Sequence, residues 1–174
     1  MKALRVPRLF TGLVRLLAAG SALTLTAFML TDPQAGLADT ALPIDGTLSV
    51  NIMSAPTAPG IFSIVANGIG STSHVGNLFF ELHKTINFND GTMLGTFTMT
   101  DENGDTLTGN YAGVINAPNS KGFALFSGQL TFTAGTGRFL NVTGTVSFSA
   151  MSNRGTGQAV YSFKGSISLP GSGG

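Results

Sequence analysis

The chain has 174 residues, of which 10% are charged and 43% hydrophobic, and it contains 24 Gly, no Cys and no Trp. This length is typical of one domain with a short appendage, and the high apolar content argues against intrinsic disorder. The formal net charge of +1 argues against a dedicated nucleic-acid-binding protein, and without Cys there is no disulfide, no Cys-ligated zinc and no thiol nucleophile.

The first 38 residues have the pattern of a helical secretory signal. Four basic residues precede an uncharged apolar run, Leu16–Leu30, which is shorter than the roughly 20 residues of a membrane-spanning helix. Gly36 and Ala38 supply the small residues expected before a cut after Ala38. We therefore expect residues 1–38 to be a cleaved signal peptide and the protein to be secreted or periplasmic, with an uncleaved anchor helix as the alternative.

The charges divide at the predicted cleavage site. Residues 1–38 hold four basic residues and one Asp, a net charge of +3, whereas residues 39–174 hold five basic and seven acidic residues, a net charge of −2. The exported domain is therefore expected to be mildly acidic.

Residues 39–174 alternate between apolar and polar side chains, which is typical of strands with one buried face. The alternation predicts eight strands, over residues 44–53, 61–69, 75–88, 92–100, 105–115, 123–133, 139–150 and 159–169. The connections are short and rich in Gly, Asn, Asp and Pro, and Asn103-Gly104 favours a tight hairpin. Longer loops are expected over residues 55–60 and 117–122. The strands are therefore expected to form an antiparallel meander.

One glycine lies on the apolar face of each predicted strand. Glycine has no side chain to pack against its neighbours, so its recurrence inside strands marks a bend or a close approach of two backbones. Such bends let a sheet coil and close. The set is Gly46, Gly68, Gly76, Gly95, Gly109, Gly128, Gly144 and Gly165. We expect an all-β fold, a single eight-stranded antiparallel β-barrel over residues 39–174, whose interior is packed or holds one small ligand. An open sandwich is the alternative.

Three stretches carry a family resemblance: Gly70–Gly76 (GSTSHVG), Asp105–Gly113 (DTLTGNYAG) and Thr133–Phe139 (TAGTGRF). With the strands between them, they resemble bacterial secreted proteins that have an allene-oxide-cyclase-like barrel, relatives of the dirigent and calycin-type barrels. The resemblance covers most of residues 44–169 and implies the barrel fold. The plant enzymes of this fold cyclise an unsaturated fatty-acid epoxide, but their active-site residues find no match in this sequence, so the resemblance does not imply that activity.

Polar residues suited to catalysis are few. Glu81 and His83 lie on one face of the third predicted strand, and a carboxylate beside an imidazole suits general acid–base work. They are the catalytic candidates. However, the alternation of side chains places both on the face opposite to the apolar one, which predicts a pair on the surface. His74 lies in the turn before this strand, where it either braces the turn or binds a ligand at the barrel mouth.

Tyr111 and Tyr161 are the only tyrosines, and both fall on the apolar face of their strands. A buried phenol needs a partner for its hydroxyl, so each is either a core residue whose hydroxyl is hydrogen-bonded or a polar group that binds a ligand.

Asp101, Asn103 and Asp105 have the spacing of the first ligands of a calcium-binding loop. The residues that such a loop needs at its later positions are absent, so we expect a hairpin instead. Arg138 follows a Gly-rich turn that precedes a strand, so we expect it to brace the turn or pair with an acidic loop rather than bind phosphate.

The sequence predicts a secreted barrel that binds a small apolar ligand or has a structural role, because it shows no assembled catalytic set. One alternative is a cyclase or isomerase that acts on an apolar, lipid-like substrate in the barrel. Another is an oligomeric surface or matrix component. We expect no metal, no cofactor, no nucleic-acid partner and no membrane contact after signal cleavage, with a homo-oligomer as a possible assembly.

Overall fold

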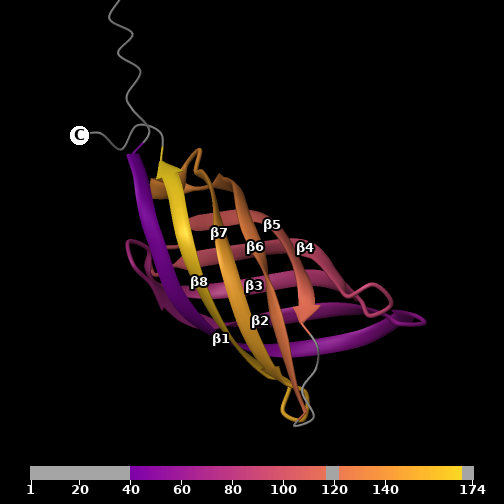
Figure 1. Ribbon diagram of the computed structural model, residues 1–174. Helices are drawn as coiled ribbons and strands as arrows, with labels where there is room; N and C mark the ends of the chain where they lie inside the picture. Colours follow the sequence, from indigo (N-terminus) through magenta and orange to yellow (C-terminus); the bar gives the residue numbers. More distant parts are fainter. Residues whose placement is uncertain (1–39, 117–121, 170–174) are drawn as a thin grey trace, which may run out of the picture. The chain divides into compact units, whose positions relative to one another are not determined.

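The computed structural model describes residues 40–116 and 122–169. Each strand pairs antiparallel with the next in sequence, and β8 pairs with β1, so the sheet closes into a barrel (Figure 1). The elements are β1 (Thr40–Ala58), β2 (Ile61–Thr72), β3 (Gly76–Asn87), β4 (Thr92–Asp101), β5 (Thr106–Asn116), β6 (Phe123–Gly135), η1 (Gly137–Phe139), β7 (Thr143–Asn153) and β8 (Gln158–Leu169). The predicted eight-stranded antiparallel barrel is confirmed, whereas the predicted signal segment, residues 1–38, lies outside the described residues.

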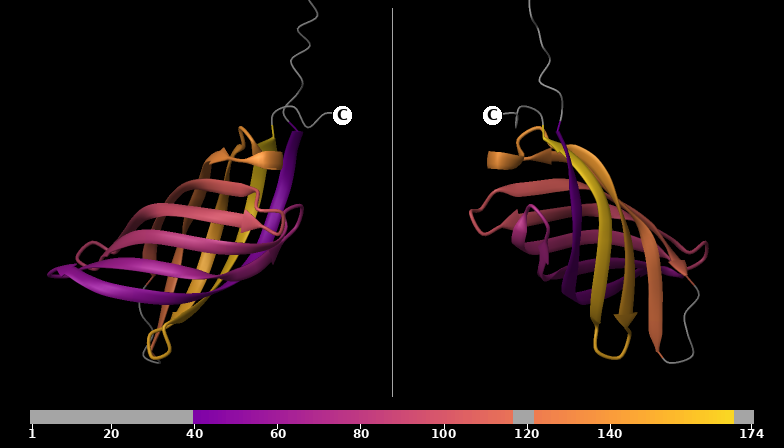
Figure 2. Two further views of the ribbon diagram at one scale, coloured as in Figure 1. Left: turned by 180° about the vertical axis from the view of Figure 1, so that it is seen from behind. Right: turned by 60° about the vertical axis from the view of Figure 1, so that its left-hand side comes forward.

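Strand β1 is much longer than the predicted residues 44–53, because it pairs with both of its neighbours in turn. Its residues 40–51 form a ladder with β8, and its residues 46–58 form a ladder with β2. Figure 2 shows the consequence: β2–β5 cross the direction of β6–β8, and β1 runs along both groups. Only Pro59 and Gly60 remain as the turn in the predicted loop over residues 55–60.

Strand β7 begins at Thr143, four residues later than predicted. Gly137 and Asn141 both have positive φ angles, 54° and 61°, which extended strands do not adopt. Gly137–Phe139 forms a single 3-10 turn instead, and Phe139 and Val142 are buried. The connection between β6 and β7 therefore folds over one end of the barrel rather than extending the sheet.

The inward-facing side chains form one continuous apolar core. Its largest fully buried members include Tyr111, Tyr161, Phe80 and Leu82. The outward positions are mainly Thr, Ser and Asn, as the alternation predicted for a sheet with one wet face. The barrel is thus a packed core, not an open tube, along most of its length.

The strand glycines mark close approaches between backbones. A Cβ atom would come within 3.0 Å of the neighbouring strand at seven of the eight predicted positions: Gly46, Gly68, Gly95, Gly109, Gly128, Gly144 and Gly165. The eighth, Gly76, has open space around it and a φ of 84°, and it is the first residue of β3, directly after the β2–β3 turn. The interpretation of the glycines as sites of bending or close approach is therefore confirmed at seven positions and wrong at Gly76.

Candidate functional site

The two ends of the barrel differ, and one end is closed by Arg138. This end carries the β2–β3, β4–β5 and β6–β7 turns. The Arg138 guanidinium donates from Nε to Asp101 Oδ2 at 2.9 Å and from Nη2 to the Val75 carbonyl at 2.7 Å. Arg138 thereby joins all three turns, and it stacks over the ring of Phe139 with 4.5 Å from Cζ to the ring centroid. The prediction that Arg138 pairs with an acidic loop is confirmed.

Asp101 is the acceptor at the centre of this closed end. Its buried side chain receives hydrogen bonds from the amide nitrogens of Asn103 and Asp105, at 2.8 and 3.0 Å, besides that from Arg138. Burial alone would raise the pKa of the Asp101 carboxyl, but these hydrogen bonds and the Arg138 charge outweigh it and lower the pKa. The segment that imitates a calcium loop is therefore a hairpin braced by Asp101, as the sequence predicted.

The opposite end, between the β1–β2, β3–β4 and β7–β8 turns, is hollowed into a pocket of about 290 Å³. Most of its wall is apolar, with polar side chains near the rim. The lining residues are Ile52, Ser54, Phe62, Ile64, Lys84, Ile86, Phe88, Ala124, Phe126, Ser152, Asn153, Arg154 and Gly157. This pocket is the candidate functional site.

Lys84 is the charged group that reaches from the pocket into the core. It lies on β3 between Leu82 and Ile86, on the inward face, and is only 4% exposed. Its Nζ donates to Tyr111 Oη and Tyr161 Oη, each at 3.2 Å, and to Met93 Sδ at 3.7 Å. It also lies 4.7 Å from the ring centroid of Tyr111 and 5.0 Å from that of Phe126. An ammonium group is thus enclosed by aromatic rings and two phenol oxygens.

The surroundings of Lys84 change the acid–base properties of the cluster. Burial disfavours the charged form of the amine and lowers the pKa of Lys84 from 10.5 to about 7. Burial also raises the pKa of Tyr161 to about 12 and raises that of Tyr111 even further, so both phenols stay protonated at physiological pH. Lys84 is therefore the group of this cluster that changes its charge near neutral pH.

The tyrosines are held in place by ring contacts. Tyr111 stacks on Phe148 with 4.7 Å between ring centroids, and Tyr161 contacts both Phe148 and Phe80. These contacts fix the phenol oxygens on either side of Lys84. Because Lys84 Nζ is hydrogen-bonded to these two oxygens, buried core residues determine where the amine lies.

The structure brings together only some of the residues that the sequence singled out. Tyr111 and Tyr161 lie inside the barrel and share Lys84 as a partner. Glu81 and His83 are exposed on the outer face of β3, away from the pocket. His74 is exposed in the β2–β3 turn, with a φ of 67°, at the closed end of the barrel.

Lys84 is the site residue that the sequence reasoning missed. The apolar residues that indicate the inward face of β3 are Leu78, Phe80, Leu82 and Ile86, and position 84 lies between the last two of them. The parity alone places Lys84 on the inward face, because residues two apart on a strand share a face. A lysine on an otherwise apolar face was therefore the available signal.

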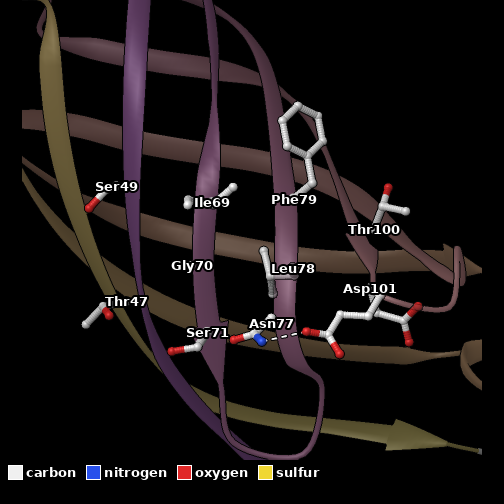
Figure 3. A pocket seen from close by; sticks show the side chains of 11 residues that line it. Thr47, Ser49, Ile69, Gly70, Ser71, Asn77, Leu78, Phe79, Thr100 and Asp101 are labelled. Atoms are coloured by element: carbon white, nitrogen blue, oxygen red, sulfur yellow. Dashed lines mark hydrogen bonds between the residues drawn. The ribbon is translucent and has the colours of Figure 1, made fainter.

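A second hollow, of about 690 Å³, lies on the outer face of β1–β4 and is shallow and open (Figure 3). Ile69 and Phe79 are cross-strand neighbours that project from its floor and are exposed, and Asn77 donates a hydrogen bond to Glu102 at its edge. Such an open surface encloses a ligand far less than the barrel-end pocket does.

Comparisons of the chain with protein-family models, with curated proteins and with solved structures gave no match. Within residues 40–116 and 122–169, no helix is long and apolar enough to cross a membrane. In the same part of the chain, no three or more His, Asp or Glu side chains are grouped so that they could hold a metal ion. The barrel-end pocket and Lys84 together form the candidate functional site.

Proposed function

We propose that this protein binds a small, mostly apolar molecule in the pocket at the open end of its barrel. The observation that carries the proposal is the pocket itself, a concave, largely apolar site with a few polar groups, among them the buried Lys84, which is the usual composition of small-molecule sites. In liquid water each molecule, with its one non-hydrogen atom, occupies roughly 30 Å³. At that density the pocket of about 290 Å³ has room for about ten non-hydrogen atoms.

The signal-like residues 1–38 support a secreted or periplasmic setting for this binding, and the resemblance to allene-oxide-cyclase-like barrels fits an apolar ligand. Both stay predictions. In such a setting the protein would carry or sequester its ligand outside the cytoplasm.

A matched pair of variants on β1 tests the proposal. Ser54 lines the pocket, whereas the adjacent Met53 points outward and is 60% exposed. We expect 1-octanol, with nine non-hydrogen atoms, to shift the NMR signals of pocket residues such as Ile64 and Ala124. The Ser54→Trp variant should lose these shifts and the Met53→Trp variant should keep them. If neither 1-octanol nor octanoate perturbs the pocket, the proposed function is wrong.

A second candidate function is isomerase or cyclase chemistry on an apolar substrate. It is favoured by Lys84, whose amine has a pKa of about 7 and lies 3.2 Å from two phenol oxygens. An amine that exchanges its proton near neutral pH is suited to general acid–base catalysis. The discriminating observation is chemical: an enzyme would return an altered molecule from a mixture of unsaturated lipids, whereas a binding protein would return the molecule unchanged.

The oligomeric alternative has support from the outer face. Leu125, Met151 and Val160 are consecutive cross-strand neighbours on β6, β7 and β8, and each is 40–48% exposed. An apolar row of this kind suits contact with a second copy of the chain. Light scattering on the purified protein and on a Met151→Lys variant tests this: a dimer or trimer that dissociates in the variant supports it, and a monomeric wild type contradicts it.

A further inference from the structure

The charged residues among the described lining of the barrel-end pocket are both positive. Lys84 lies at its inner end and Arg154 at its rim, in the turn between β7 and β8, and none of the described lining residues is Asp or Glu. Residues 39–174 as a whole carry a net charge of −2. The pocket is therefore a positive site in a mildly acidic domain, and its electrostatic complement is an anion.

Within residues 40–116 and 122–169, the ammonium group of Lys84 has hydrogen-bond partners but no counter-ion. Two of its three protons point to Tyr111 Oη and Tyr161 Oη, and the third points to Met93 Sδ, a weak acceptor at 3.7 Å. Of the described strands around it, β5 and β8 present these two tyrosines, and β2, β4 and β6 present Ile64, Met93 and Phe126. A buried charge without an opposite charge is costly, so an entering anion would relieve this cost.

We propose that the ligand is an apolar molecule with a single carboxylate, and that the carboxylate binds Lys84 with the apolar part pointing to the mouth of the barrel. This inference rests on the proposed function and names its ligand class. A carboxylate oxygen accepts the Nζ–H hydrogen bond that Met93 Sδ now accepts. Lys84 offers one positive charge and one N–H that is bonded only to a weak acceptor, which suits a ligand with a single negative charge. A phosphate dianion would need further hydrogen-bond donors. Arg154 at the rim attracts the anion to the pocket.

Octanoate and 1-octanol form the decisive pair of probes, because they have the same chain length and differ in the charge of the head group. We expect wild-type protein to bind octanoate at least tenfold more tightly than 1-octanol in isothermal titration calorimetry. The Lys84→Met variant should lose this preference and still bind 1-octanol. Lys164→Met, which removes an exposed lysine from the outer face of β8, should keep it.

The pH dependence supplies a second readout on the unaltered protein. A bound carboxylate stabilises the charged amine and raises its pKa above the value of about 7 in the free protein. Binding above pH 7 therefore takes up a proton, and the octanoate affinity should fall by up to tenfold per pH unit from pH 7 upward while the 1-octanol affinity stays constant. Below pH 7 and down to about 5.5, where the amine is charged and the carboxylate ionised, the octanoate affinity should be level.

The outcomes separate this inference from the proposed function. Equal affinity for the two probes, a preference that survives in Lys84→Met, or an octanoate affinity that does not change from pH 7 to 9 would each overturn the carboxylate assignment and leave apolar binding intact. Failure of both probes to bind would overturn the proposed function itself.

Discussion

Gly95 on β4 lies directly opposite Lys84 on β3, and a Cβ atom on Gly95 would stand 2.6 Å from both the Cα and the Cβ of Lys84. On its other side Gly95 is paired with Tyr111 of β5. The missing side chain therefore leaves the space over which Lys84 reaches the Tyr111 hydroxyl. The glycine and the buried amine are parts of one arrangement.

We expect Gly95→Ala to destabilise the barrel. The new Cβ would also lie 2.1 Å from the His83 carbonyl oxygen, so the β3 and β4 backbones must separate. Overpacking of this kind typically costs about 1–3 kcal/mol, measurable by urea denaturation. Gly155→Ala is the control, because its Cβ meets only a side-chain oxygen of Asn153 at 3.3 Å, and it should cost less than about 0.5 kcal/mol. Equal stability of the two variants would contradict the role of Gly95.

The low pKa of Lys84 makes the folded protein more stable as the pH rises above 7. Between about pH 7 and 10.5 the unfolded chain holds a proton on Lys84 that the folded chain has released, so raising the pH favours folding. The slope is at most about 1.4 kcal/mol per pH unit. Thermal or urea unfolding of ligand-free protein from pH 7 to 9 should show a gain of roughly 2 kcal/mol relative to Lys84→Met.

The range from pH 7 to 9 lies below the pH at which the tyrosines affect stability. Their raised pKa values lower stability only where the phenols of the unfolded chain ionise, near pH 10. Lys84→Met replaces the buried ammonium with an apolar group of similar length, so it should be at least as stable as wild type at pH 6. Parallel pH profiles of the two proteins would contradict a neutral amine in the core.

Asp101 and Glu102 are neighbours with very different expected contributions to stability. Asp101→Ala leaves the Arg138 guanidinium and two backbone amides without their acceptor, which should cost about 2–3 kcal/mol. Glu102→Ala removes an exposed side chain and should change stability by less than about 0.5 kcal/mol. The comparison requires only the two unfolding midpoints at neutral pH.

The Asp101 contribution should also depend on pH in a defined direction. Its folded-state pKa is lowered, so its stabilising effect is present above the ordinary carboxyl pKa of about 4 and is lost as the pH falls through the folded-state value. The difference in unfolding free energy between wild type and Asp101→Ala should therefore shrink below pH 4. A constant difference down to pH 2 would show that the carboxylate charge contributes nothing.

Export can be tested at the predicted cleavage site. If residues 1–38 are a signal peptide, N-terminal sequencing of exported protein should begin at Asp39, one residue before β1 starts at Thr40. Ala38→Arg removes the small residue that cleavage needs and should leave the segment attached. Recovery of intact Met1 in the membrane fraction of cells expressing the wild type would support the anchor-helix alternative.

The fold was predictable because the alternation of apolar and polar residues determines which side chains face inward. The glycines inside the strands indicated closure, and seven of them lie at close approaches between backbones. The strand limits were less predictable. The start of β7 depends on the left-handed backbone at Gly137 and Asn141, which residue alternation does not reveal. The end of β1 depends on its ladder with β2, which is a long-range pairing.

The site was only half predictable for a related reason. The inward direction of Tyr111 and Tyr161 follows from parity and is correct. That both hydroxyls meet Lys84 depends on which strands become neighbours across the barrel, because β3 and β8 are not adjacent in the sheet. Likewise, which barrel end stays open depends on how the β6–β7 connection folds over the other end.

Thr40 and Leu169 are paired with each other at the Arg138 end, opposite the pocket. Anything attached at either residue, such as a fluorescent reporter, a solid support or a second protein, would therefore stand at the far side of the barrel from the mouth. A surface coated with barrels tethered in this way would present every pocket outward. The proposed preference for apolar carboxylates would make such a surface an oriented capture reagent for them.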